Sequence, residues 1–518
     1  MNNYLSMLAI AALFFCSTCT QKESTETQVA EVPVREWAPE DIRNLPGLHA
    51  KRGLIINSPE ATPGYILFHP ALSTSAWLMN LDGEIVHEWK GELNPLSSYL
   101  QDDGRIFRLE RDPDFPVFDG GGQSGVLREY TWDGDLLWNF EYATEEYLSH
   151  HDFELLPNGN ILSIAWEAKT KEESIAAGRN PEQIPGAGLW PDKIVEIEPT
   201  RPEGGKIVWE WHLWDHFVQE FDPEKDNYGK ITDHPRKVDI NANAHVPHMT
   251  NEQVEGLKKL DMATSNATPE NQGSDMTHVN AISYNPKLDQ IIISSAGFSE
   301  IWIIDHSTTT EEAQGSNGGR WGHGGDLLYR WGNDANYGRG SLQDQKLFGQ
   351  HDVKWIPVGY PGAGNLTVFN NDVFNPEGKF PSGMGAFMST QKSDFSVADL
   401  ANYSAVFELT PPMDENSAYI LEEGGTFGPE GPTWSYTAPD KLSLYSAFIS
   451  GAHRMKNGNT FVTAGARGRF MEVTPEGDVL WEYWNPYNQQ YRLPAGDLPH
   501  PTGPFIFYQF RKNFFYCV

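Results

Sequence analysis

Short segments in which apolar and polar residues alternate occur in pairs along most of the chain, and a turn rich in Gly, Asp or Pro joins the two members of each pair. Alternation with a period of two predicts β-strands, and the turn residues predict that each pair forms a β-hairpin. One such hairpin recurs at residues 77–89, 127–138, 194–211, 301–331, 406–421 and 470–483. The chain is therefore built from repeats.

A second hairpin with its own turn lies ahead of most of these copies, as at residues 153–162 and 454–461. Two hairpins make a four-stranded sheet, and six such sheets arranged radially leave few exposed strand edges. A pair of β-sandwiches is the alternative, but the regular repetition of one module disfavours it. The sequence predicts an all-β fold, a six-bladed β-propeller of four-stranded blades with long loop insertions, over residues 60–518.

Two long insertions interrupt the repeats, at residues 215–276 and 308–325. Functional sites are commonly built from loops that a rigid scaffold holds, so we expect both insertions on one face of the propeller. The final stretch, from Phe505 onward, is rich in aromatic residues and stops as if inside a structural element.

Composition agrees with a turn-rich β protein, since the chain has 48 Gly, 35 Pro and 12% aromatic residues. The formal net charge of -33 argues against nucleic acid and anionic membrane surfaces as main partners. It does not exclude a small anionic substrate, because one local site can oppose the field of the whole protein.

The N-terminus has the features of a targeting segment. Residues 7–16 form an apolar run that is too short to span a bilayer, and a polar stretch follows it. We expect a signal peptide over residues 1–19, a linker and N-terminal segment over residues 20–59, and no transmembrane span in the mature protein. Cys16 and Cys19 are candidates for lipidation. The protein is thus expected to be exported, and to be periplasmic or lipid-anchored at the cell envelope.

Three histidines occupy one register when the inner hairpins are aligned on their turns. His151, His278 and His351 each stand near the start of the first, channel-lining strand of a blade, and Ser450 holds that position in the sixth blade. Asn280 follows His278 by two residues, so its side chain is expected on the same face of the strand. Histidines in equivalent inner positions face a common axis, which predicts a functional cluster.

Such a cluster suits two chemistries. Neutral imidazoles are common ligands of zinc and related metals. Alternatively, one imidazole acts as a nucleophile while the others stabilise charge or carry protons. The residues alone leave both open.

The sequence around two of these histidines resembles that of the bacterial arylsulfate sulfotransferases, and the similarity in organisation covers about residues 60–490. The matching segments are residues 277–280, 291–295, 350–351, 355–356 and 366–370. The resemblance implies a periplasmic enzyme that moves a sulfuryl group from a phenolic sulfate ester to another phenol, with no nucleotide donor, other cofactor or metal.

The resemblance also implies roles for the aligned residues. His351 would be the nucleophile of a ping-pong reaction through a sulfo-histidine. His278 and Asn280 would bind the sulfuryl oxygens, and His151 would lie near the aromatic oxygen. His150 is expected to point to the opposite face of its strand and to be structural.

One position departs from the family pattern, because Ala296 stands where the family has an arginine that clamps the sulfuryl oxygens. Two other functions therefore remain alongside sulfuryl transfer. The propeller could be a weakened or inactive binding protein, or the three histidines could serve a metal-dependent lyase or hydrolase.

Overall fold

The computed structural model describes most of the chain between Arg52 and Tyr487. The described residues are 52–70, 73–112, 117–242, 250–259, 267–373, 403–439, 441–446 and 448–487, together with the backbone of strand 507–513. The predicted signal peptide, Cys16 and Cys19 lie outside them.

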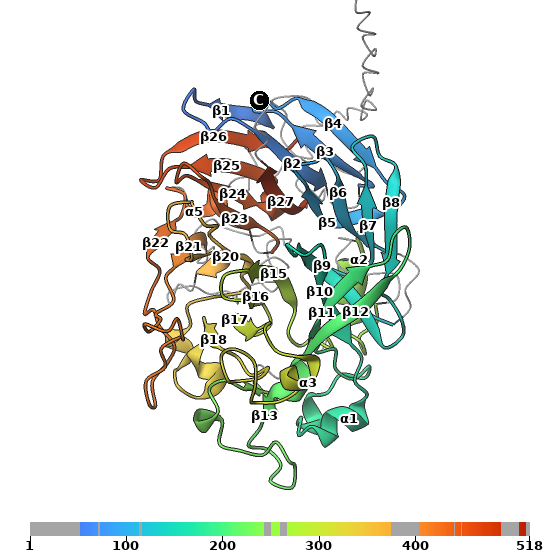
Figure 1. The fold of residues 1–518 in the computed structure, drawn as a ribbon, viewed down its shortest axis with the longest axis vertical. Coiled ribbons are helices and arrows are strands. Elements are labelled where there is room, and N and C mark those ends of the chain that lie inside the picture. Colours follow the sequence, from blue (N-terminus) through green and yellow to red (C-terminus); the bar gives the residue numbers. More distant parts are fainter. Residues whose placement is uncertain are drawn as a thin grey trace, which may run out of the picture.

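Six sheets follow one another around a ring (Figure 1), which confirms the predicted six-bladed propeller. Blade one contains β2 (Tyr65–Pro70), β3 (Ser75–Met79) and β4 (Ile85–Lys90). Blade two contains β5 (Asn94–Leu100), β6 (Ile106–Arg111), β7 (Gly125–Tyr130) and β8 (Leu136–Glu141). Blade three contains β9 (Tyr147–Leu155), β10 (Ile161–Glu167), β11 (Asp192–Pro199) and β12 (Gly205–His212). Blade four contains β15 (Val279–Asn285), β16 (Gln290–Ser295), β17 (Glu300–Asp305) and β18 (Tyr329–Trp331). Blade five contains β19 (His351–Trp355), β20 (Leu366–Val373), β21 (Tyr403–Leu409) and β22 (Trp434–Tyr436). Blade six contains β23 (Gly451–Arg454), β24 (Thr460–Ala464), β25 (Arg469–Val473) and β26 (Val479–Trp484).

Strands from both ends of the chain complete the ring. The inner strand of the first blade is β27 (Phe507–Asn513), which pairs antiparallel with β2. This strand lies within the aromatic stretch at the end of the sequence. From the predicted N-terminal segment, β1 (Gly53–Asn57) adds a fifth, outermost strand to the sixth blade by pairing with β26.

The fifth blade corrects one predicted strand. Its outermost strand is β22, paired with β21, and not residues 418–421. Tyr419 forms only an isolated bridge with Met413, and its buried hydroxyl donates to Oε1 of Gln290 at 2.8 Å. The alternation that suggested a strand there instead reflects the packing of a connecting loop against the fourth blade.

The two long insertions connect strands at opposite ends of their blades but contact each other, since Nε2 of His216 in the first donates to the carbonyl of Ala313 in the second at 2.8 Å. The expectation that both form loops on one face stays a prediction. Residues 215–276 join β12 to β15 and reach the end where the inner strands begin; they include β13 (Phe217–Val218), β14 (Val238–Asp239) and α2 (Asn251–Lys259). Residues 308–325 join β17 to β18 at the other end, and their short α3 (Thr310–Ala313) packs on β12.

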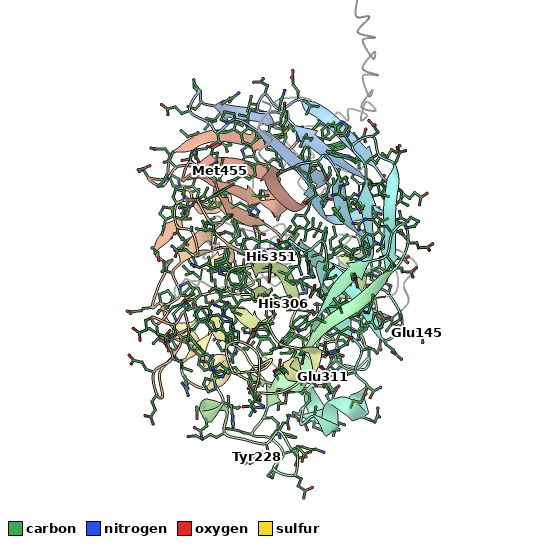
Figure 2. The ribbon with its side chains drawn as sticks, viewed as in Figure 1. Glu145, Tyr228, His306, Glu311, His351 and Met455 are labelled. Atoms are coloured by element: carbon green, nitrogen blue, oxygen red, sulfur yellow. The ribbon has the colours of Figure 1, made fainter. Side chains whose placement is uncertain are left out.

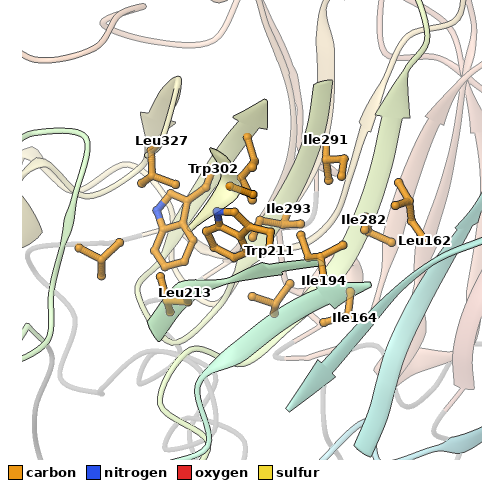
Figure 3. Packing of buried hydrophobic residues seen from close by; sticks show 14 of the residues in the cluster. Leu162, Ile164, Ile194, Trp211, Leu213, Ile282, Ile291, Ile293, Trp302 and Leu327 are labelled. Carbon is orange, nitrogen blue, oxygen red and sulfur yellow. The ribbon is translucent and has the colours of Figure 1, made fainter. Parts of the chain in front are cut away.

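Buried aliphatic and indole side chains fill the space between neighbouring blades. Between the third and fourth blades, Trp211 and Trp302 pack with isoleucines such as Ile194 and Ile293 (Figure 3). Because neighbouring sheets share such clusters, the sheets pack face to face around the ring.

A ring of tryptophans links the outer strands. In every blade, the indole N–H of a tryptophan on the outermost or adjoining strand donates to a backbone carbonyl in the next blade, at 2.7–3.2 Å. The pairs among the described residues are Trp89–Thr131, Trp138–Gly204, Trp211–Gly325, Trp331–Pro429, Trp434–Pro475 and Trp481–Leu81. The last pair joins the sixth blade to the first.

A single carboxylate ties four inner strands together. Asp152 on β9 is fully buried and accepts the N–H of Ile282 on β15 at 3.2 Å and the Nζ of Lys354 on β19 at 2.9 Å. It also accepts the hydroxyls of Tyr99 and Ser97 on β5. Blades two to five are therefore held in register at the residue that follows His151.

We predict that Trp481→Phe lowers the free energy of unfolding by about 1–3 kcal/mol, because it leaves the Leu81 carbonyl unpaired where the ring closes. Urea denaturation of the purified protein measures the change. Trp132→Phe is the control, since Trp132 is 40% exposed and a phenyl ring keeps part of its stacking on His87, so its replacement should cost less than Trp481→Phe. Equal stability of the two variants would contradict the role of the tryptophan ring.

Candidate active site

The three predicted histidines lie together at the same end of three neighbouring inner strands. His151 belongs to β9, His278 directly precedes β15, and His351 begins β19. The rings of His151 and His278 are 4.5 Å apart and nearly perpendicular, at 80°. His278 and His351 are both close enough to His151 to lower its pKa. His351 lies near the middle of the ring of blades (Figure 2).

Left-handed backbone occurs at this position, or one residue after it, in four blades of the described chain. The φ angles are 55° at His151, 47° at His278, 57° at Asp352 and 112° at Ser450. Residues other than glycine adopt such angles rarely, and each costs of order 1–3 kcal/mol. The pairing of β9, β15 and β19 with the adjoining strands also shifts register here. These bulges interrupt the regular alternation of side chains.

The prediction that His150 points away from the site is therefore wrong. Its Nδ1 lies 2.8 Å from Nδ1 of His151, and its Nε2 lies 2.6 Å from Oδ1 of Asp192. The left-handed residue that follows His150 breaks the period of two on which the prediction was based. His150 is fully buried and connects the site to a buried carboxylate.

Hydrogen bonds fix the tautomer of His351. Its Nδ1–H donates to Oδ1 of Asn371 at 2.8 Å and to the carbonyl of Gly349 at 3.0 Å. Asn371 is oriented in turn by its amide, which donates to the carbonyls of Ser446 and Ile449. With the proton on Nδ1, the lone pair lies on Nε2, where the nearest donor is the N–H of Ile449 at 3.3 Å.

Burial lowers the pKa of His351 to about 4, with a further lowering by the charge of His278, although the hydrogen bond to Asn371 opposes the shift. His351 is therefore neutral at pH 7. Burial also holds the pKa of His151 well below the usual value. The two rings are uncharged and carry lone pairs.

His278 has the opposite character. Asp275 accepts its Nδ1–H at 2.6 Å and its backbone N–H at 2.9 Å. Burial by itself would lower the pKa of His278, but the charge and hydrogen bond of Asp275 outweigh it and raise the pKa. The site thus sets an imidazole that favours its protonated form beside two that favour the neutral form.

Asn280 reaches the neighbouring blade. Its Nδ2 donates to the carbonyl of Gln350 at 2.8 Å, next to His351. Its Oδ1 is buried and has no hydrogen-bond partner among the described residues. Asn280 therefore couples the strand of His278 to the strand of His351.

Two of three consecutive glycines between β6 and β7 lie against the histidines, a feature that reasoning from polar side chains did not predict. A Cβ atom on Gly122 would lie 2.0 Å from Cε1 of His151, and one on Gly121 would lie 3.5 Å from Cε1 of His278. The carbonyl of Gly122 accepts the N–H of His151 at 2.8 Å. The run of glycines from Gly120 was the available sequence signal, because only glycine allows so close an approach.

Ala296, which replaces the expected arginine, directly follows β16. Its N–H donates to the carbonyl of His278 at 3.2 Å, and the residue is half-buried. The position is therefore beside His278.

Within the described ranges, no group of three or more His, Cys, Asp and Glu residues is arranged to hold a metal ion. Asp275 and Asp192 are both engaged by histidine nitrogens.

The fold and the site together define a six-bladed propeller that presents buried histidines of contrasting charge at the start of its inner strands. The chain belongs to the arylsulfotransferase (ASST) family, whose family model matches residues 101–408. This range contains His151, His278, Asn280 and His351, and it confirms the family resemblance seen in the sequence. Membership of this family implies aryl-sulfate sulfotransferase activity on phenolic sulfates.

Solved structures share the fold only distantly. A protein of unknown function from Bacteroides caccae is 12% identical, with a TM-score of 0.39, and the alignment covers 82% of this chain and 94% of the other. A streptogramin B lyase is 10% identical, with a TM-score of 0.35 and coverage of 86% of each chain. Virginiamycin B lyase from Staphylococcus aureus is 10% identical, with a TM-score of 0.34 and coverage of 85% and 86%. No curated protein matches the chain.

We predict that Asp275→Asn lowers the pKa of His278, because an uncharged amide removes the attraction that opposes burial. As the pH rises, His278 of the variant then loses its positive charge at a lower pH than His278 of the parent protein. Titration of the histidine Cε1–H resonances by NMR measures the shift. His212 is the control, since its pKa of about 9 reflects burial outweighed by Glu167 and Glu210. An unchanged His278 titration would show that Asp275 does not set its charge.

Proposed function

We propose that the enzyme transfers the sulfuryl group by a ping-pong reaction in which Nε2 of His351 is the nucleophile. The observation that carries this proposal is the fixed tautomer of His351, with its proton held on Nδ1 by Asn371 and Gly349. A neutral imidazole with its lone pair on Nε2 is nucleophilic, and a pKa of about 4 keeps His351 neutral at pH 7.

In the first half-reaction, Nε2 attacks the sulfur of the phenolic sulfate ester. An N–S bond forms while the bond between sulfur and the phenol oxygen breaks, and its electron pair leaves on the phenolate. In the second half-reaction, the oxygen of an acceptor phenol attacks the same sulfur, and the electrons of the N–S bond return to Nε2.

The neighbouring residues have complementary roles in this proposal. The imidazolium of His278 and the amide of Asn280 stabilise the charge that builds on the sulfuryl oxygens. His151, which is neutral, transfers the proton to and from the phenol oxygen. These roles follow from the family correspondence and from the contrast in charge between His278 and the other two rings.

We propose in addition that the protein is exported and acts in the periplasm or at the cell envelope, with Cys16 or Cys19 as candidate lipidation sites. The apolar run over residues 7–16 supports this location. In the part of the chain that is described, no helix has the length and apolar character needed to cross a membrane.

We predict that His351→Ala abolishes transfer and leaves the fold intact, because it removes the atom that forms the N–S bond. Intact mass after exposure to 4-nitrophenyl sulfate without an acceptor should show one added sulfuryl group on the parent protein and none on the variant. Equivalent His278 and His151 variants should be impaired but still form the adduct.

His306→Gln is the control for this experiment. His306 contacts Glu196 and Asp289 at the far ends of the strands, so its variant should form the adduct at the parent rate. A folded His351→Ala protein that transfers sulfuryl groups as fast as the parent would rule out His351 as the nucleophile.

We predict that Ala296→Arg raises the turnover of simple aryl sulfates. A guanidinium beside His278 can contact two sulfuryl oxygens, which a methyl group cannot. One preorganised donor is typically worth about 10²–10³ in rate. Steady-state kinetics of the folded variant measures the gain.

Ala296→Ser is the control, because it adds a polar group without a positive charge. An arginine variant that is no faster than the parent would show that the site does not lack a cation. If parent and variant are both inactive toward every aryl sulfate tested, the binding-protein alternative is favoured.

A further inference from the structure

A line of three groups leads from the site into the protein interior. Oδ1 of Asp192 lies 2.6 Å from Nε2 of His150, and Nδ1 of His150 lies 2.8 Å from Nδ1 of His151. Asp192 and His150 are 1% and 0% exposed. The ring of Trp166 stacks on His150 at 4.1 Å and 16°, which holds the imidazole in this plane. Each contact has the length of a hydrogen bond through which a proton can pass.

We propose that Asp192 and His150 are positioning residues that supply a proton to His151 and take it back, so that His151 can protonate the leaving phenolate and later deprotonate the acceptor phenol. This inference rests on the proposed sulfuryl transfer through His351 and extends it to residues that do not contact the substrate.

The protons balance in both directions. Before the first half-reaction, Asp192 is protonated and donates to Nε2 of His150; Nδ1–H of His150 donates to Nδ1 of His151, and the proton of His151 is on Nε2. As His151 gives that proton to the phenolate oxygen, it takes one from His150, and His150 takes one from Asp192. Asp192 is left as a carboxylate, which offsets the positive charge of the sulfo-imidazole on His351. The acceptor phenol reverses each transfer.

The surroundings of Asp192 suit a group that gains and loses a proton. Burial raises its pKa, and the nearby carboxylate of Asp275 raises it further, while His150 lowers it; the pKa is raised overall. Its other oxygen accepts the N–H of Val279 at 3.1 Å, next to His278. The groups that face His151 are His150, His278 and His351, and with burial they keep it neutral.

A second buried pair in the same protein shows what a purely structural arrangement looks like. Nδ1 of His216 lies 2.9 Å from Oδ1 of Asp326, and its ring stacks parallel to Trp211, at 5.6 Å. Its Nε2, however, donates to the carbonyl of Ala313 at 2.8 Å. A carbonyl cannot pass a proton onward, whereas the imidazole of His151 can. This difference makes His216 a matched control for His150.

The test compares donors with different leaving groups. We measure kcat/KM for a series of substituted phenyl sulfates with the parent enzyme and with His150→Gln, Asp192→Asn and His216→Gln. For donors whose phenol has a pKa near that of tyrosine, about 10, the His150 and Asp192 variants should lose about 10²-fold or more. For 4-nitrophenyl sulfate, whose phenolate leaves without a proton, the loss should be no more than about tenfold.

His216→Gln should leave the ratio between donors unchanged. A uniform loss across all donors, or no loss, in the His150 and Asp192 variants would overturn the relay, because a structural defect does not depend on the leaving group. The two variants act at different points, so either one that folds is sufficient.

Intact mass separates this outcome from a failure of the proposed function. If the parent and both relay variants form the His351 adduct with 4-nitrophenyl sulfate, the nucleophile stands whatever the donor series shows. If the parent forms no adduct, sulfuryl transfer through His351 fails and the relay fails with it.

Discussion

Indole N–H groups that donate from each blade to a carbonyl of the next hold the ring of the described structure closed, and the geometry of the site depends on that closure. The bond from Trp481 to Leu81 connects the sixth blade to the first. β1 pairs with the sixth blade and β27 pairs with the first, so both strands join a ring that is already linked at its outer strands. A blade held at its outer strand and packed on both faces cannot slide along its neighbours. The inner strands therefore cannot shift relative to one another along the propeller axis, and residues in one register lie together at that axis.

At the axis, Asp152 fixes the same register from within. A buried carboxylate must be fully hydrogen-bonded to be tolerated, and Asp152 meets this need with donors from three other blades, including the cation of Lys354. Asp352 acts similarly by accepting the N–H of Ala452 on the sixth blade at 3.0 Å. Each aspartate directly follows a site histidine. The contacts that join the blades thus also determine where His151 and His351 stand, which couples stability to the geometry of the site.

The repeats made the fold and the shared histidine register predictable, because hairpin turns and period-two alternation are local. Contacts between distant segments were not predictable in the same way. β27 completes the first blade by pairing with β2, a strand from the other end of the chain. The outermost strand of the fifth blade was misassigned, although its Trp434 makes the same kind of indole hydrogen bond as the tryptophans of the other blades. His150 was missed because the left-handed φ of 55° at His151 leaves no pattern in a single sequence. Asp275 and Asn371, which set the charge and tautomer of the site, come from elements other than the aligned strand starts.

An enzyme with a formal net charge of -33 has to bring an anionic ester to its centre, and the arrangement of the site reduces that difficulty. The carboxylates closest to the histidines are already engaged, Asp275 by His278 and Asp192 by His150. The pKa values of His278 and Asp192 are both raised. Both shifts make the local charge less negative, since a raised pKa favours the cationic form of a histidine and the neutral form of an aspartic acid. The local field at the inner strand ends is thereby less negative than the composition suggests. Because burial strengthens every such interaction, a few groups around His278 outweigh a much larger number of solvated surface carboxylates.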